Sequence, residues 1–179
     1  LKFASYKIQK DVLINECFGT SNFYSRNLID NGIKAEDLIV NCYPLQSKWA
    51  RENNVKFMRI NMDLHPRLYS LPLVGSLFSK LPRTLDILIE QIKHFKPDII
   101  YSQNISLFNH EKLMLLKKYS KLLVGQIACP LPSEDYIKGY DLILTSFPHF
   151  LEKLRNIGVN AEYFKIGFDP KVLNLVKNQ

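Results

Sequence analysis

Residues 121–146 read KLLVGQIACPLPSEDYIKGYDLILTS, and this stretch decides the fold class. It contains two runs rich in Leu, Ile and Val, at residues 121–128 and 140–146. In both runs apolar residues follow one another directly instead of alternating with polar ones, which is typical of parallel strands covered on both faces. The stretch therefore predicts two neighbouring strands of a buried parallel sheet.

The rest of the chain repeats this pattern of apolar runs separated by amphipathic segments. The further predicted strands cover residues 37–41, 55–60, 97–103 and 161–166. The predicted helices cover residues 1–18, 85–95, 110–119 and 150–157. Strands that alternate with helices predict an α/β fold, namely a Rossmann-like, doubly wound and mostly parallel sheet with helices on both faces.

Length, charge and cysteine content narrow the class of protein. The chain has 179 residues, 46% of them hydrophobic and 23% charged, which predicts a single globular domain over residues 1–179. The net charge is +7, but the lysines are spread along the sequence, so we expect no nucleic-acid partner. A peripheral contact with an anionic membrane is the better interpretation of this charge. Three widely separated cysteines without metal-binding spacing indicate reduced thiols and a cytoplasmic protein.

Two segments carry a resemblance to a known family. Residues 19–40 read GTSNFYSRNLIDNGIKAEDLIV, in which a glycine opens a helix, Leu28 is expected on its buried face, and Gly32 ends it before a strand. Residues 140–173 read YDLILTSFPHFLEKLRNIGVNAEYFKIGFDPKVL, a strand ending in serine, a helix, a further strand and a closing G-F-D motif. Together with PDIIYSQN and VGQIACPLP, these segments resemble the amino-terminal domain of GT-B fold glycosyltransferases, in a bacterial subgroup similar to CgeB-like proteins and to glycosyltransferase family 4.

This resemblance implies a nucleotide-sugar-dependent glycosyltransferase whose amino-terminal domain binds a sugar or lipid-linked acceptor. The donor, a nucleotide-diphosphate sugar, would bind to a second, carboxy-terminal Rossmann domain that follows Gln179. The first strand of the family would precede Leu1, so the chain is expected to be truncated at both ends and to be inactive alone. No tightly bound cofactor and no metal are expected, and the sequence has no DxD pair.

Two of the expected acceptor-binding loops lie in the first part of the chain and after the strand at 97–103. Ligands of open α/β sheets bind beyond the carboxyl ends of the strands. Gly19, Thr20 and Ser21 lie where a helix begins, so backbone N–H groups there could hold a sugar or phosphate oxygen, or the loop is an ordinary helix cap. Gln103 and Asn104 carry neutral amides that suit sugar hydroxyls, or Asn104 merely turns the chain.

Two further loops follow the strands of the opening stretch. Gln126 precedes a loop stiffened by two prolines and could present its amide to the acceptor, or the prolines simply make a rigid strand exit. Ser146 ends a strand and is expected to bind the acceptor as well. His149 opens a helix, whose positive end favours a neutral imidazole that can take a proton from an acceptor hydroxyl. A surface histidine in the first helical turn is the alternative interpretation.

Residues 63–82, DLHPRLYSLPLVGSLFSKLP, form a connection longer than most in compact domains. Its apolar residues, flanked by basic ones, could contact the inner face of an anionic membrane. The alternative is a loop folded over the core or against a further domain.

Two other functions remain open from the sequence. A non-catalytic Rossmann-like module that binds a small ligand or a partner would show the same strand pattern. Another nucleotide-dependent transferase, or a dehydrogenase, is less favoured because the chain has no GxGxxG motif.

Overall fold

The computed structural model describes residues 3–17, 19, 21–56, 84–167 and 169–173. Contacts between residues divide the chain into two compact units, Leu1–Gln91 and Ile92–Gln179. The boundary falls inside helix α5 (Thr84–Phe95). The single domain expected over residues 1–179 stays a prediction. Of the helices in the described ranges, none is long and apolar enough to cross a membrane.

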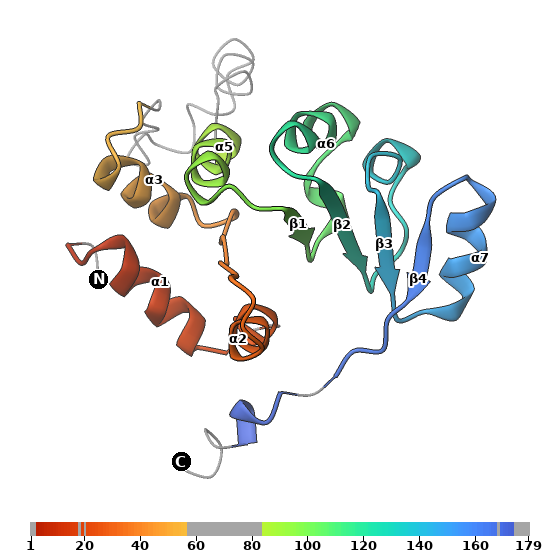
Figure 1. Ribbon diagram of the computed structural model, residues 1–179, viewed down its shortest axis with the longest axis horizontal. Helices are drawn as coiled ribbons and strands as arrows, with labels where there is room; N and C mark the ends of the chain where they lie inside the picture. The colour runs from red at the N-terminus through yellow and green to blue at the C-terminus, as the bar shows by residue number, and fades with distance from the viewer. Residues whose placement is uncertain (1–2, 18, 20, 57–83, 168, 174–179) are drawn as a thin grey trace, which may run out of the picture. The chain divides into compact units, whose positions relative to one another are not determined.

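The second unit is built on a four-stranded sheet, shown in Figure 1. Its strands are β1 (Ile99–Ser102), β2 (Leu122–Ile127), β3 (Leu142–Thr145) and β4 (Ala161–Tyr163). Every pairing is parallel, and the spatial order β1-β2-β3-β4 follows the sequence. The α/β, Rossmann-like fold predicted from the sequence is therefore confirmed, and the four strands lie within the predicted ranges.

Helical segments connect these strands. They are η2 (Ile105–Leu107), α6 (His110–Leu116), η3 (Lys117–Tyr119), η4 (Glu134–Tyr136) and α7 (Pro148–Asn156). Strand β2 lies between β1 and β3 and is buried over most of its length, with Leu123 fully covered. This burial explains why its apolar residues are consecutive, since both faces of a central parallel strand are covered.

Gly125 allows close packing at the middle of β2. A Cβ atom at this position would lie 2.5 Å from Ile105 Cγ2 and 3.0 Å from Tyr140 Cδ1. Both distances are too short for ordinary carbon contacts, so the segment before α6 and the segment before β3 approach β2 only because residue 125 has no side chain.

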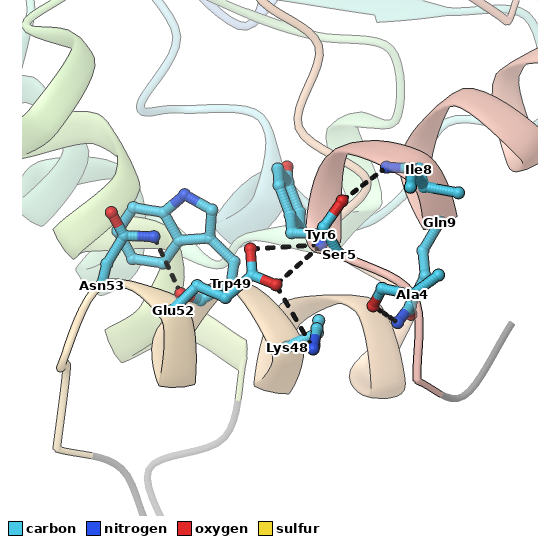
Figure 2. Close-up of polar contacts among 9 residues, drawn as sticks. All are labelled: Ala4, Ser5, Tyr6, Ile8, Gln9, Lys48, Trp49, Glu52 and Asn53. Carbon is cyan, nitrogen blue, oxygen red and sulfur yellow. Dashed lines mark hydrogen bonds and ion pairs between the residues drawn. The ribbon is translucent and has the colours of Figure 1, made fainter.

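The first unit is helical in its described part, with α1 (Tyr6–Asn15), α2 (Phe23–Asp30) and α3 (Tyr43–Glu52) before α5. Ser5 caps α1 by accepting a hydrogen bond from the Ile8 N–H at 3.3 Å. The carboxylate of Glu52 accepts the Tyr6 N–H through both oxygens, at 3.1 and 3.2 Å, as Figure 2 shows. One carboxylate at the end of α3 thus satisfies a backbone donor in the first turn of α1.

The core of this unit forms around α3. Trp49 and Ala50 pack with Ile87 of α5, and Tyr6 and Val55 cover the cluster from the side. Burial raises the pKa of the Tyr6 hydroxyl to about 12, and the nearby negative charge of Glu36 acts in the same direction. The Tyr6 hydroxyl therefore stays neutral at physiological pH.

Residues 37–41 do not form the predicted strand, and this expectation was wrong. They have no ladder partner among the described strands, and two side chains of the helices before and after them contact this segment. The buried Gln46 amide donates to the Ile39 carbonyl oxygen at 3.0 Å, and the Ser25 hydroxyl donates to the Asp37 carboxylate. Of the other expected elements of this unit, residues 57–60 of one strand and the connection at 63–82 lie outside the described residues.

Leu28 was expected on the buried face of the first helix after Gly19, but it is 42% exposed. Helix α2 has only eight residues, and the residue that it buries is Ser25, which bonds to Asp37. A polar contact therefore covers Ser25, whereas Leu28, one helical turn further along, stays exposed.

Candidate functional site

A cavity of about 560 Å³ lies beyond the carboxyl ends of β2 and β3. Two loops form it, one directly after β2 and one that leads from β3 into the first turns of α7. The residues that line it are Ala128, Cys129, Pro130, Leu131, Phe147, His149, Phe150 and Lys153. This is the end of a parallel sheet at which α/β proteins bind their ligands.

Three rings gather on the α7 side of this cavity. The ring of His149 lies 4.4 Å from that of Phe150, nearly edge-on, and 5.6 Å from that of Phe147. The two phenylalanine rings meet at 5.4 Å in a T-shaped contact. Such pairs hold each other in place, so His149 has a defined position although its side chain is exposed.

The end of β3 fixes the direction of the chain that carries these rings. Thr145 is fully buried, and its hydroxyl accepts a hydrogen bond from the Phe147 N–H at 3.2 Å. Pro148 then occupies the first turn of α7, where a missing N–H costs nothing. Leu154, fully buried, anchors the same helix against the core. No side chain caps the amino end of α7, and the Phe150 N–H donates to the Phe147 carbonyl oxygen at 3.0 Å.

The predicted residues Gln126 and Ser146 lie beside the cavity without lining it. Gln126 is buried within β2, and its side-chain carbonyl accepts a hydrogen bond from the Tyr101 hydroxyl of β1. It therefore ties two strands together. Ser146 is half-buried at the end of β3, directly before Phe147.

Gln103 and Asn104 follow β1 and do not line this cavity. Asn104 caps η2, because its side-chain oxygen accepts the Ser106 N–H at 3.0 Å. Its own carbonyl oxygen accepts the Ser102 hydroxyl at 3.0 Å. The observed contacts of Asn104 are thus those of a residue that turns the chain, one of the two interpretations that the sequence left open.

The Gly19 loop belongs to the first unit, and Thr20 lies outside the described residues. Ser21 does not cap α2. Its hydroxyl donates to the Ile14 carbonyl oxygen of α1 at 2.5 Å, and the residue before the helix is Asn22, which makes no capping bond. Both Gly19 and Ser21 have positive φ values, of 61° and 44°, so the chain turns sharply here and Ser21 faces the helix behind it.

Phe150 and Lys153 belong to the site but were not predicted from the sequence as ligand-facing residues. Phe150 is three residues after Phe147, and Lys153 is four after His149, which places each pair on one side of the helix. This spacing was the available signal. Lys153 is also the one cationic side chain in the cavity lining, and it makes no ion pair with a described residue.

The described ranges contain no cluster of three metal-ligating side chains, and the three cysteines are free thiols. Comparisons with family models, with curated proteins and with solved structures found no match for the chain. The site offers aromatic faces, one imidazole and one ammonium group to a small ligand.

Proposed function

We propose that this chain is the acceptor-binding domain of a nucleotide-sugar-dependent glycosyltransferase. The observation that supports the proposal is the cavity beyond β2 and β3, which two of the loops named from the sequence as acceptor loops line together. Its volume of about 560 Å³ lies in the range of small-molecule sites.

The lining suits a sugar with an anionic or lipid-linked end. The exposed ring of Phe147 can pack against the C–H groups of a sugar ring, and the buried Phe150 supports it from below through their T-shaped contact. The Lys153 ammonium can hold oxygen atoms, including those of a phosphate, and the positive amino end of α7 favours the same charge. Neutral and apolar contacts thus orient the ring while one end of the cavity selects for negative charge.

His149 is the residue of the lining that can move a proton at neutral pH. In the proposed reaction an acceptor hydroxyl attacks the anomeric carbon of the nucleotide sugar. The bond between that carbon and the nucleoside diphosphate breaks, the new glycosidic bond forms, and His149 takes the hydroxyl proton. The nucleoside diphosphate leaves with the bonding electrons, so atoms and charge balance without a metal-bound step.

The proposal is tested in the natural polypeptide that contains this chain. Nucleoside diphosphate release is measured with a panel of UDP-, GDP- and dTDP-hexoses, with alkyl glycosides as acceptors. We expect acceptor-dependent release, and a loss of about a hundredfold or more in His149→Gln, because general base catalysis contributes that much. Residues 1–179 alone are expected to release none.

His110→Gln is the matched control, since His110 also lies in the first turn of a helix and is exposed. It should leave the rate unchanged. Equal rates for His149→Gln and the wild type would contradict the role of His149. Absence of release and of binding for every nucleotide sugar would contradict the glycosyltransferase itself and favour a non-catalytic binding module.

A further inference from the structure

A second cavity, of about 350 Å³, lies at the opposite end of the sheet, before β1 and β2. The end of α5 and the segment that leads into β2 form it. The residues that line it are Ile92, Lys93, Lys96, Pro97, Asp98, Lys118, Tyr119, Ser120 and Lys121. It shares no residue with the cavity beyond β2 and β3.

Four lysines converge on this cavity from segments that are far apart in the sequence. Lys93 and Lys96 come from the end of α5, and Lys118 and Lys121 from the residues before β2. The lining contains one acidic residue, Asp98, whose carboxylate Oδ1 lies 2.8 Å from the Lys121 Nζ. The formal charge of the lining is therefore +3, although the lysines appear evenly spread along the sequence.

The four lysines differ in their contacts, and two of them carry a charge that no described carboxylate compensates. The Lys93 ammonium lies 5.7 Å from the centre of the Tyr119 ring, a cation–π contact that helps to position it. Lys96 and Lys118 form no ion pair with a described residue. Lysines near helix ends can also serve to offset the helix dipole, but each helix end carries only about half a negative charge. The ends of α5 and of the α6–η3 segment together therefore leave the cavity positive.

Two observations indicate that the cavity is shaped for a ligand. The Ser120 hydroxyl oxygen is buried and has no hydrogen-bond partner in the described part of the chain, which is costly unless a ligand supplies one. Lys96 has a φ of 54°, a left-handed conformation that glycine or asparagine would adopt at lower cost. A lysine at that position gives up some stability and adds a charge to the cavity.

We propose that this cavity binds a phosphoanion, with the lysines as the cationic ligands and the Ser120 hydroxyl as a hydrogen-bond donor. The phosphate group can belong to a free phosphorylated molecule or to a lipid headgroup. Each source presents tetrahedral oxygen atoms that lysine ammonium groups bind as point charges. The site is independent of the proposed glycosyl transfer, because it lies at the other end of the sheet.

The test uses the full chain and two probes. Binding of inorganic pyrophosphate is measured by calorimetry, and binding to phosphatidylcholine vesicles with and without phosphatidylglycerol by cosedimentation. We expect Lys96→Gln/Lys118→Gln to lose binding by tenfold or more, since about two charged contacts disappear. Pyrophosphate binding alone identifies a free phosphorylated ligand, and vesicle binding alone identifies a headgroup; both outcomes support the phosphoanion site.

The control is Lys112→Gln/Lys165→Gln, which removes the same charge at exposed positions outside the cavity. It should bind as the wild type does, and equal losses in the two double variants would overturn the proposal in favour of general charge. Ser120→Ala should weaken pyrophosphate or vesicle binding about two- to tenfold without lowering the melting temperature, because it removes a buried unpaired hydroxyl. Absence of binding to both probes, or unchanged binding in the Lys96→Gln/Lys118→Gln variant, would also overturn it.

Discussion

The carboxylate of Asp141 accepts a hydrogen bond from the backbone N–H of Leu123 at 2.7 Å. Its other oxygen accepts one from the Lys117 ammonium at 2.5 Å. Asp141 directly precedes β3, Leu123 lies in β2, and Lys117 lies at the end of α6. One side chain therefore joins three segments at the start of the central strands.

The first prediction concerns the free energy of unfolding. Asp141→Ala leaves the N–H of the fully buried Leu123 without its side-chain acceptor, which should cost about 1–3 kcal/mol. Lys117→Met is the control that removes only the half-exposed ion pair, and it should cost about 1 kcal/mol or less. Urea unfolding followed by circular dichroism measures both, and equal losses would show that the backbone bond contributes nothing.

The second prediction concerns pH. Partial burial alone would raise the pKa of Asp141, but the hydrogen bonds from Lys117 and Leu123 outweigh it and lower the pKa below its usual value. A lowered pKa stabilises the fold at all pH values above the unfolded value of about 3.9, and this contribution is lost as the pH falls through the folded value. Asp141→Asn should therefore lose less stability than the wild type between about pH 6 and about pH 3. A parallel pH profile for the two proteins would rule this out.

The third prediction concerns the middle of β2. Gly125→Ala places a methyl group 2.5 Å from Ile105 Cγ2, so packing must shift, at a cost of about 1–3 kcal/mol. Gly167→Ala is the matched control, since nothing lies within 4 Å of a Cβ there and its φ is ordinary. Thermal unfolding should separate the two variants. A wild-type melting temperature for Gly125→Ala would mean that the contact relaxes freely.

The fourth prediction concerns the first unit. Glu52→Ala removes the acceptor of the Tyr6 N–H and should destabilise the contact between α1 and α3 by about 0.5–1.5 kcal/mol. Trp49 is the only tryptophan of the chain and is buried in the same unit, so its fluorescence reports this loss. Lys48→Ala removes only the ion pair with Glu52, at 3.3 Å, and should cost about 0.5 kcal/mol or less. A larger effect from Lys48→Ala than from Glu52→Ala would contradict the importance of the backbone bond.

The strands of the second unit were predictable because burial on both faces requires consecutive apolar residues, which are visible in the sequence. Each of β1, β2, β3 and β4 falls in a predicted run. Helix α3 was not predicted, because it buries the polar residues Gln46 and Ser47 beside Leu45 and Trp49. A stripe that mixes polar and apolar residues does not stand out by periodicity. Residues 37–41 show the opposite error, because their apolar run predicted a strand that does not form. The Ile39 carbonyl oxygen accepts a hydrogen bond from the Gln46 side chain and not from a neighbouring strand.

The site was predictable in outline only. Because all strands run parallel, the loops after β2 and β3 had to meet at one end of the sheet, and they line one cavity. The positions of Gln126 and Asn104 could not be foreseen, because each amide is used by a neighbour in the fold, Tyr101 or Ser106. The lysine-lined cavity was hidden for another reason. Lys96 and Lys121 are separated by a strand and a helix, and only the crossover brings them together.

The parallel arrangement of the four strands has a consequence for how such a protein can change. The loops before the strands and the loops after them are different pieces of chain, and the two cavities have no residue in common. Substitutions in the lining of one cavity therefore leave the lining of the other intact, provided that the buried strands between them keep their packing. A lineage that carries this fold can exchange the side chains at one end of the sheet while it retains those at the other.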